Sequence, residues 1–242
     1  MTPPSSTPEA ITELIAKWKT DKTPAQEPID WNRERWEAPD SRYPKIASHK
    51  TFIKGLPNPI GREDVRGYGA DASRSTAKAV EAFVASMVWG FGGTGYGVYR
   101  TNRILTVNPD APQRLHDVAE ILKSDGPVEG YRAIANSDQS RLKWLGPAFG
   151  TKYLYFCSPD DNPALVLDAL MAAWLNKHCE PSEPKLRPWQ WSTTKYEEYL
   201  ANMTKWAGSA CTPAELETII FTAEADRRTG NQWSTKKSGK KQ

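Results

Sequence analysis

Lys152 and Asp168 are the residues of this 242-residue chain whose types and spacing best suit chemistry. Lys152 ends the glycine-rich segment Leu145-Gly146-Pro147-Ala148-Phe149-Gly150-Thr151-Lys152, and Asp168 follows sixteen residues later. An uncharged lysine amine is a nucleophile, and a carboxylate beside it stabilises a carbon that develops positive charge. The pair therefore predicts covalent chemistry at a carbon that develops positive charge.

The chain length between the two residues allows their side chains to meet. A helix from Thr151 to Cys157 travels about 10 Å, residues 158–163 can reverse the chain, and an extended segment over 164–167 returns about 13 Å. Asp168 would then be the N-cap of a helix over 169–177. The positive end of that helix favours an ionised carboxylate and a neutral amine.

The turn before Lys152 is a candidate anion site. Its glycines, Gly146 and Gly150, stand on either side of Pro147-Ala148-Phe149. We expect the N–H groups of this turn and of the following first helical turn to point outward without acceptors. A phosphate oxygen would fit there without any base being read.

A second glycine cluster, Gly90 to Gly97, matches G-x-G-x-x-G at Gly90, Gly92 and Gly95. A dinucleotide-binding loop would have to follow a strand and open a helix, whereas this cluster follows a predicted helix. Glycines among aromatic residues also let a backbone approach a flat ligand closely. A helix cap packed on its own aromatic residues is the third interpretation, and all three stay open.

The surrounding pattern is that of a nearly all-α protein. Residues 75–89 place apolar side chains at helical spacing and predict a central buried helix, and Thr212 to Glu215 form a capping box. Residues 21–44 carry too many prolines and charges for a regular element and predict an extended surface arm. The other expected helices cover about 7–19, 110–123, 127–135, 192–207 and 212–228.

Composition sets the remaining limits. The chain has 38% hydrophobic and 25% charged residues and a formal charge of +3, as in a soluble globular protein. No segment has the pattern of a signal peptide or membrane span, and three scattered cysteines favour reduced thiols in the cytoplasm. We expect an N-terminal helix and arm over 1–45, a helical domain over 46–232, and a disordered basic tail over 233–242.

The segment Pro147-Ala148-Phe149-Gly150-Thr151-Lys152 resembles the hairpin of the helix-hairpin-helix DNA glycosylase superfamily, in particular of the 8-oxoguanine glycosylases. Asp168 matches the aspartate that follows the hairpin helix in that superfamily. Residues 89–100, with 145–156, are similar to a bacterial group within it. Ala148 stands where the family has its first hairpin glycine, and three cysteines cannot build the four-cysteine cluster of some members.

The resemblance implies a two-lobed helical fold with a cleft, a hairpin at about 138–157, and a damaged or modified base flipped out of double-stranded DNA. Lys152 would attack C1′ of the deoxyribose, with Asp168 stabilising the charge on the sugar. The implied protein is a monomer in the bacterial cytoplasm, associated with the nucleoid. It needs no metal or cofactor, although the hairpin could hold a monovalent cation. The implied DNA contacts are Gly146, Pro147, Ala148, Phe149, Gly150, Thr151 and Arg100. The implied base pocket is Trp89, Phe91, Gly92 and Tyr96.

Three alternatives remain beside the default substrate, 8-oxoguanine. The enzyme could defend against phage by excising hypermodified bases, such as glucosylated hydroxymethylcytosine. A non-catalytic module could keep the hairpin only as a phosphate clamp. A nucleotide-binding protein could use the Gly90 to Gly97 loop, and it would bind a free dinucleotide saturably.

Overall fold

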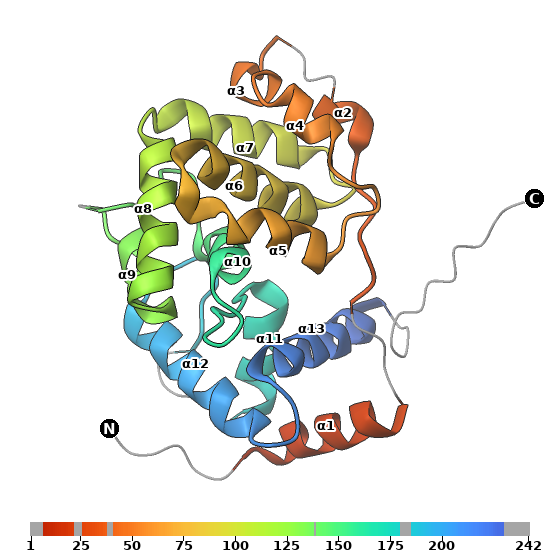
Figure 1. Ribbon diagram of the computed structural model, residues 1–242. Coiled ribbons are helices and arrows are strands. Elements are labelled where there is room, and N and C mark those ends of the chain that lie inside the picture. Colours follow the sequence, from red (N-terminus) through yellow and green to blue (C-terminus); the bar gives the residue numbers. More distant parts are fainter. Residues whose placement is uncertain (1–6, 22–25, 38–40, 138, 180–184, 230–242) are drawn as a thin grey trace, which may run out of the picture.

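The computed structural model describes residues 7–21, 26–37, 41–137, 139–179 and 185–229 (Figure 1). Over these residues the fold is all-α, as predicted, and an isolated antiparallel bridge joins Ile29 to Ile60. The helices are α1 (Glu9–Asp21), α2 (Arg33–Glu37), α3 (Pro44–Ala47), α4 (Lys50–Lys54), α5 (Arg62–Ala70), η1 (Ala72–Arg74), α6 (Thr76–Phe91), α7 (Tyr96–Val107), α8 (Ala111–Ser124), α9 (Pro127–Ala135), α10 (Pro147–Cys157), α11 (Ala169–His178), α12 (Thr193–Ala207) and α13 (Pro213–Thr229).

Helix α6 is the central element, because α5, α7, α8 and α10 all pack against it. Its apolar residues from Ala79 to Trp89 are buried, which confirms the predicted core helix. Ser75 caps its first turn by accepting a hydrogen bond from the Lys78 N–H. The helix ends at Gly92, where φ is +50°, and not at Gly90 as predicted. Gly90 therefore lies inside α6 and faces α10.

The predicted extended surface arm over residues 21–44 is only partly right: residues 26–32 form no helix, but the chain then folds into the core. Helix α2 forms there, and Trp31 and Trp36 are buried in the core. Two tryptophans remove enough apolar area from water to outweigh the prolines and charges around them. Figure 1 shows α2 beside α3 and α4 at one end of the molecule, whereas α1 lies at the other.

The C-terminal helices follow their predicted boundaries closely. Helix α12 ends at Gly208, where φ is +53°. Helix α13 begins with the predicted capping box, in which the Thr212 backbone and hydroxyl donate to Glu215 and the Thr212 hydroxyl accepts from the Glu215 N–H. Helix α13 packs against α11 and α1. The predicted basic tail over 233–242 lies outside the described residues.

The three cysteines are free thiols. Cys157 is buried, Cys179 and Cys211 are half-buried, and none of the three forms a disulfide. Within the described residues, every helix is too short or too polar to cross a membrane.

Candidate active site

Helices α10 and α11 bring Lys152 and Asp168 together, as the chain length predicted. Lys152 lies in the second turn of α10, and its Nζ donates to Asp168 Oδ2 at 2.8 Å. The two side chains are only 8% and 14% exposed. Nζ also lies 3.4 Å from the Ala148 carbonyl oxygen, one turn earlier in α10. The site is therefore an amine and a carboxylate in direct contact and largely shielded from water.

Asp168 is the N-cap of α11, and this position stabilises its charge. Its Oδ1 accepts hydrogen bonds from the N–H groups of Leu170 and Met171, at 3.0 and 3.2 Å. Burial by itself would raise the pKa of Asp168. The Lys152 ammonium group and the two backbone hydrogen bonds outweigh burial and lower the pKa below its ordinary value. Asp168 is thus held as an anion.

Residues 164–167, which carry the chain back to Asp168, are not helical and have no sheet partner. Their buried backbone groups are satisfied by side chains instead. The Tyr196 hydroxyl accepts from Leu165 N–H at 3.0 Å and donates to the Leu165 carbonyl at 2.8 Å. The Tyr199 hydroxyl donates to the Val166 carbonyl at 2.8 Å. Two tyrosines of α12 therefore hold the segment that places Asp168.

Two hydroxyl groups anchor the ends of the same segment. Ser158 accepts from the Ala164 N–H at 2.9 Å, and Thr151 accepts from the Leu167 N–H at 3.0 Å. The Thr151 hydroxyl also donates to the Pro147 carbonyl within α10. Thr151 thus ties the residue before Asp168 to the helix that carries Lys152.

We expect Tyr196→Phe to lower the stability of the protein markedly. The change leaves the Leu165 N–H and carbonyl unpaired in the core, at about 1–3 kcal/mol for each group. Urea unfolding would measure the loss. Tyr68→Phe is the control, because no hydrogen bond to the Tyr68 hydroxyl is found among the described residues. Equal midpoints for the two variants would contradict the role given to Tyr196.

Aromatic rings and a glycine enclose the Lys152 side chain. Its Nζ lies 5.9 Å from the centre of the Trp89 ring and 5.6 Å from that of Phe149. A Cβ on Gly90 would lie 2.8 Å from the Phe149 ring and 3.0 Å from Lys152 Cδ. Gly90 therefore lets α6 approach α10 closely at the lysine, which explains this glycine without a nucleotide.

We expect Gly90→Ala to destabilise the protein by about 1–3 kcal/mol, the usual cost of overpacking a core. Gly67 offers a matched control, since it lies in a helix and no atom is within 4 Å of its ideal Cβ. Gly67→Ala is expected to stabilise the protein by about 0.5–1 kcal/mol. Thermal unfolding of both variants tests this. A change in stability of the same sign in both variants would contradict the close approach of α6 to α10 at Gly90.

The hairpin differs from its prediction in two respects. Residues 139–146 are not helical, and α10 begins at Pro147, before the expected start at Thr151. The expectation of free N–H groups is wrong for three residues. Phe149 and Gly150 donate to the Gly146 carbonyl, and Ala148 donates to the Pro188 carbonyl at 3.3 Å. The loop before α12 covers this helix end.

The residues predicted for a base pocket do not all lie at Lys152. Trp89 is buried beside it, and Phe91 stacks on Phe149 with ring centres 4.1 Å apart. Gly92 is buried against Ile29 as the C-cap of α6. Tyr96 is 50% exposed. It lines a separate open pocket of about 490 Å³ with Asn32, Arg35, Tyr43, Gly95 and Tyr99.

Sequence reasoning missed Arg62, which reaches the site from α5. Its guanidinium lies 5.3 Å from the Trp89 ring and 4.9 Å from the Tyr155 ring. It pairs at 2.8 Å with Glu217 of α13, whose side chain is fully buried. Burial alone would lower the pKa of Arg62, but Glu217 raises it. No local pattern links residues 155 positions apart, so this pair carried no sequence signal.

Exposed tryptophans near the α10 N-terminus were also missed. Trp144, two residues before the Gly146 N-cap, is 43% exposed and has a φ of 72°. Arg103 lies 3.6 Å and Arg100 5.2 Å from the centre of its ring. Trp189, which is 75% exposed, follows Pro188 in the covering loop. The sequence signal for these exposed residues was a tryptophan next to a charged or polar residue, as Trp144 is to Lys143 and Trp189 to Gln190.

One group among the described residues could supply three ligands to a metal ion. His116, Asp117 and Glu120 place one ligand atom each within 4.8 Å of the others. All three belong to α8, whereas Lys152 and Asp168 belong to α10 and to the start of α11.

The described residues thus form an all-α fold in which a shielded lysine in the second turn of α10 contacts the aspartate that caps α11. The family described as "Putative 8-oxoguanine DNA glycosylase OGG-like protein" matches residues 22–221. The chain belongs to this OGG-like glycosylase family. No curated protein and no solved structure matches the chain.

Proposed function

We propose that the protein is a DNA glycosylase with AP lyase activity, in which Lys152 is the nucleophile and Asp168 its electrostatic partner. The observation that carries this proposal is the 2.8 Å contact between Lys152 Nζ and Asp168 Oδ2. Membership of a glycosylase family supports DNA as the partner. Family membership supports glycosylase activity on DNA, whereas the lyase step and the identity of the excised base are part of the proposal.

The proposed reaction uses both groups in order. Asp168 is the nearest acceptor for a proton of Lys152, which must attack as a neutral amine. The amine bonds to C1′ while the bond from C1′ to the base breaks, and the base leaves with that electron pair. Asp168 passes the proton that it accepted to the departing base and, again as an anion, stabilises positive charge on the sugar. Opening of the sugar gives a Schiff base on Lys152, and loss of a C2′ proton then breaks the 3′ C–O bond.

The surface around the α10 N-terminus supports DNA as the ligand. Three of the most exposed large hydrophobic side chains in the described residues are Tyr96, Trp144 and Trp189. Aromatic faces stack on unpaired bases, and arginines such as Arg100 and Arg103 attract phosphates. We infer that this surface contacts the duplex and that the target nucleotide is extruded into a cleft between two helical lobes.

The default substrate of the proposal is 8-oxoguanine, as the family description suggests. The test is borohydride trapping on duplexes that carry 8-oxoguanine, uracil, an abasic site or a glucosylated hydroxymethylcytosine. Borohydride reduces the Schiff base and leaves a covalent adduct of protein and DNA that is resolved by electrophoresis. The damaged-base duplex that traps best identifies the substrate, including the phage-type alternative.

The outcomes separate the remaining interpretations. An adduct on the abasic duplex alone would support the lyase chemistry and reject all the tested bases. Base release without any adduct would indicate a monofunctional glycosylase. Duplex binding with neither release nor adduct would favour the non-catalytic module.

A further inference from the structure

A small basic pocket adjoins the return segment at Leu167, the residue before Asp168. Its volume is about 160 Å³, which is below the roughly 300–1,000 Å³ of sites for drug-sized ligands. It is lined by Tyr131, Leu167, Lys185, Leu186, Arg187, Gln190, Ser192 and Lys195. Three of these residues are cationic and none is acidic. The size and charge suit a small tetrahedral anion.

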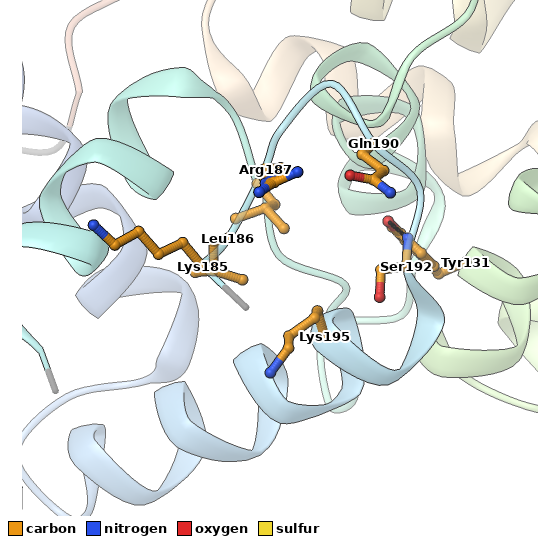
Figure 2. Close-up of a pocket in the computed structure, with 8 residues that line it drawn as sticks. Tyr131, Lys185, Leu186, Arg187, Gln190, Ser192 and Lys195 are labelled. Carbon is orange, nitrogen blue, oxygen red and sulfur yellow. Dashed lines mark hydrogen bonds between the residues drawn. The ribbon is translucent and has the colours of Figure 1, made fainter. Parts of the chain in front are cut away.

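The neutral groups of the pocket add hydrogen-bonding capacity. Figure 2 shows Gln190, Ser192 and Tyr131 on one side, Lys185, Leu186 and Arg187 on the other, and Lys195 below them on α12. Ser192 is the N-cap of α12, but its side chain makes no capping hydrogen bond. The first N–H groups of this 15-residue helix therefore add a positive end to the basic side chains.

The position of the pocket connects it to the proposed chemistry. Leu167 forms part of its wall and is followed directly by Asp168. The loop that supplies Arg187 and Gln190 also supplies the Pro188 carbonyl that accepts from Ala148 at the start of α10. Trp191 of the same loop packs against Gly150. An anion held here would lie next to both helix ends that carry the lysine and the aspartate.

We propose that this pocket binds one backbone phosphate of the DNA strand that carries the target nucleotide. The proposal rests on the function proposed above. Arg187 would supply guanidinium donors, and Lys195, whose side chain is 16% exposed, a largely shielded ammonium group. Lys195 is paired with Glu198 at 2.8 Å. Glu198 is therefore a competitor that the phosphate must partly displace.

The test is a double-mutant cycle. It combines each variant of the pocket with DNA in which a single phosphate has been neutralised. Methylphosphonates are placed one at a time around a tetrahydrofuran abasic analogue, and dissociation constants are measured for wild type, Arg187→Gln and Lys195→Gln. At one position, the neutral phosphate is expected to weaken wild type about tenfold and to have no further effect in either variant. The slope of log K against log salt should fall by about 1 in each variant.

Two further variants sharpen the test. Glu198→Gln removes the competing carboxylate and should tighten binding only when that phosphate is charged. Lys19→Gln, an exposed lysine of α1, should change neither affinity nor slope. Arg187 is exposed, so its variant keeps the test valid if Lys195→Gln fails to fold.

The failures are distinguishable. If wild type binds the duplex but no phosphate couples to either variant, the pocket assignment is overturned and the proposed function is untouched. If wild type binds no duplex, the proposed function fails, and the DNA assignment of the pocket fails with it. Inorganic phosphate that shifts in ³¹P spectra with wild type alone, in the absence of any coupling on DNA, would assign the pocket to free phosphate instead.

Discussion

Lys152→Gln is expected to abolish borohydride trapping and to slow base release by on the order of 10⁴-fold or more, as loss of a covalent nucleophile does in other enzymes. The glutamine amide can still donate to Asp168, and its size fits the space between Trp89 and Phe149. The fold should therefore survive. The measurement is single-turnover release from the duplex that wild type traps best.

Duplex affinity separates an enzyme from a binding module. The Lys152 side chain is only 8% exposed, so it adds little to phosphate attraction, and affinity should stay within about tenfold of wild type. Lys177→Gln, an exposed lysine of α11, is the matched control and should leave release unchanged. Full release by Lys152→Gln would remove Lys152 from the chemistry.

Asp168→Asn is expected to slow base release by about 10²–10³-fold, because the anion that stabilises the sugar cation is lost. Asparagine keeps the N-cap of α11, since it is as good a capping residue as aspartate. The variant also leaves a largely buried Lys152 ammonium group without its counter-ion. Breaking such a pair costs about 3–5 kcal/mol. Single-turnover kinetics and urea unfolding measure the two effects separately.

The stability effect of Asp168→Asn should depend on pH in a defined direction. The pKa of Asp168 is lower in the folded than in the unfolded protein. Its contribution to the free energy of unfolding is therefore complete above the unfolded value, about 3.9. It falls as the pH drops from there through the lower folded pKa. The difference between wild type and variant should narrow in that acidic window, and a gap that widens there would contradict the assigned shift.

Short-range rules determined much of the fold in advance. Ser75 and Lys78, or Thr212 and Glu215, are three residues apart, so the hydrogen bonds that start α6 and α13 can be predicted from neighbouring residues. Gly208 ends α12 for an equally local reason, its positive φ. The sequence also indicated that Asp168 could reach Lys152, because helix rise and extended-chain length fix how far sixteen residues can travel.

The tertiary structure alone decided how that pair is held and what surrounds it. Tyr196 and Tyr199 reach the return segment from more than 30 positions away, and Glu217 reaches Arg62 from 155. The Pro188 carbonyl accepts a hydrogen bond from the Ala148 N–H, which local helix rules had predicted to be free for a phosphate. Such contacts depend on which helix faces pack together, and that is set by the burial of the whole apolar surface. The types and spacing of nearby residues therefore predicted the reacting groups, whereas their support and the basic pocket followed only from packing.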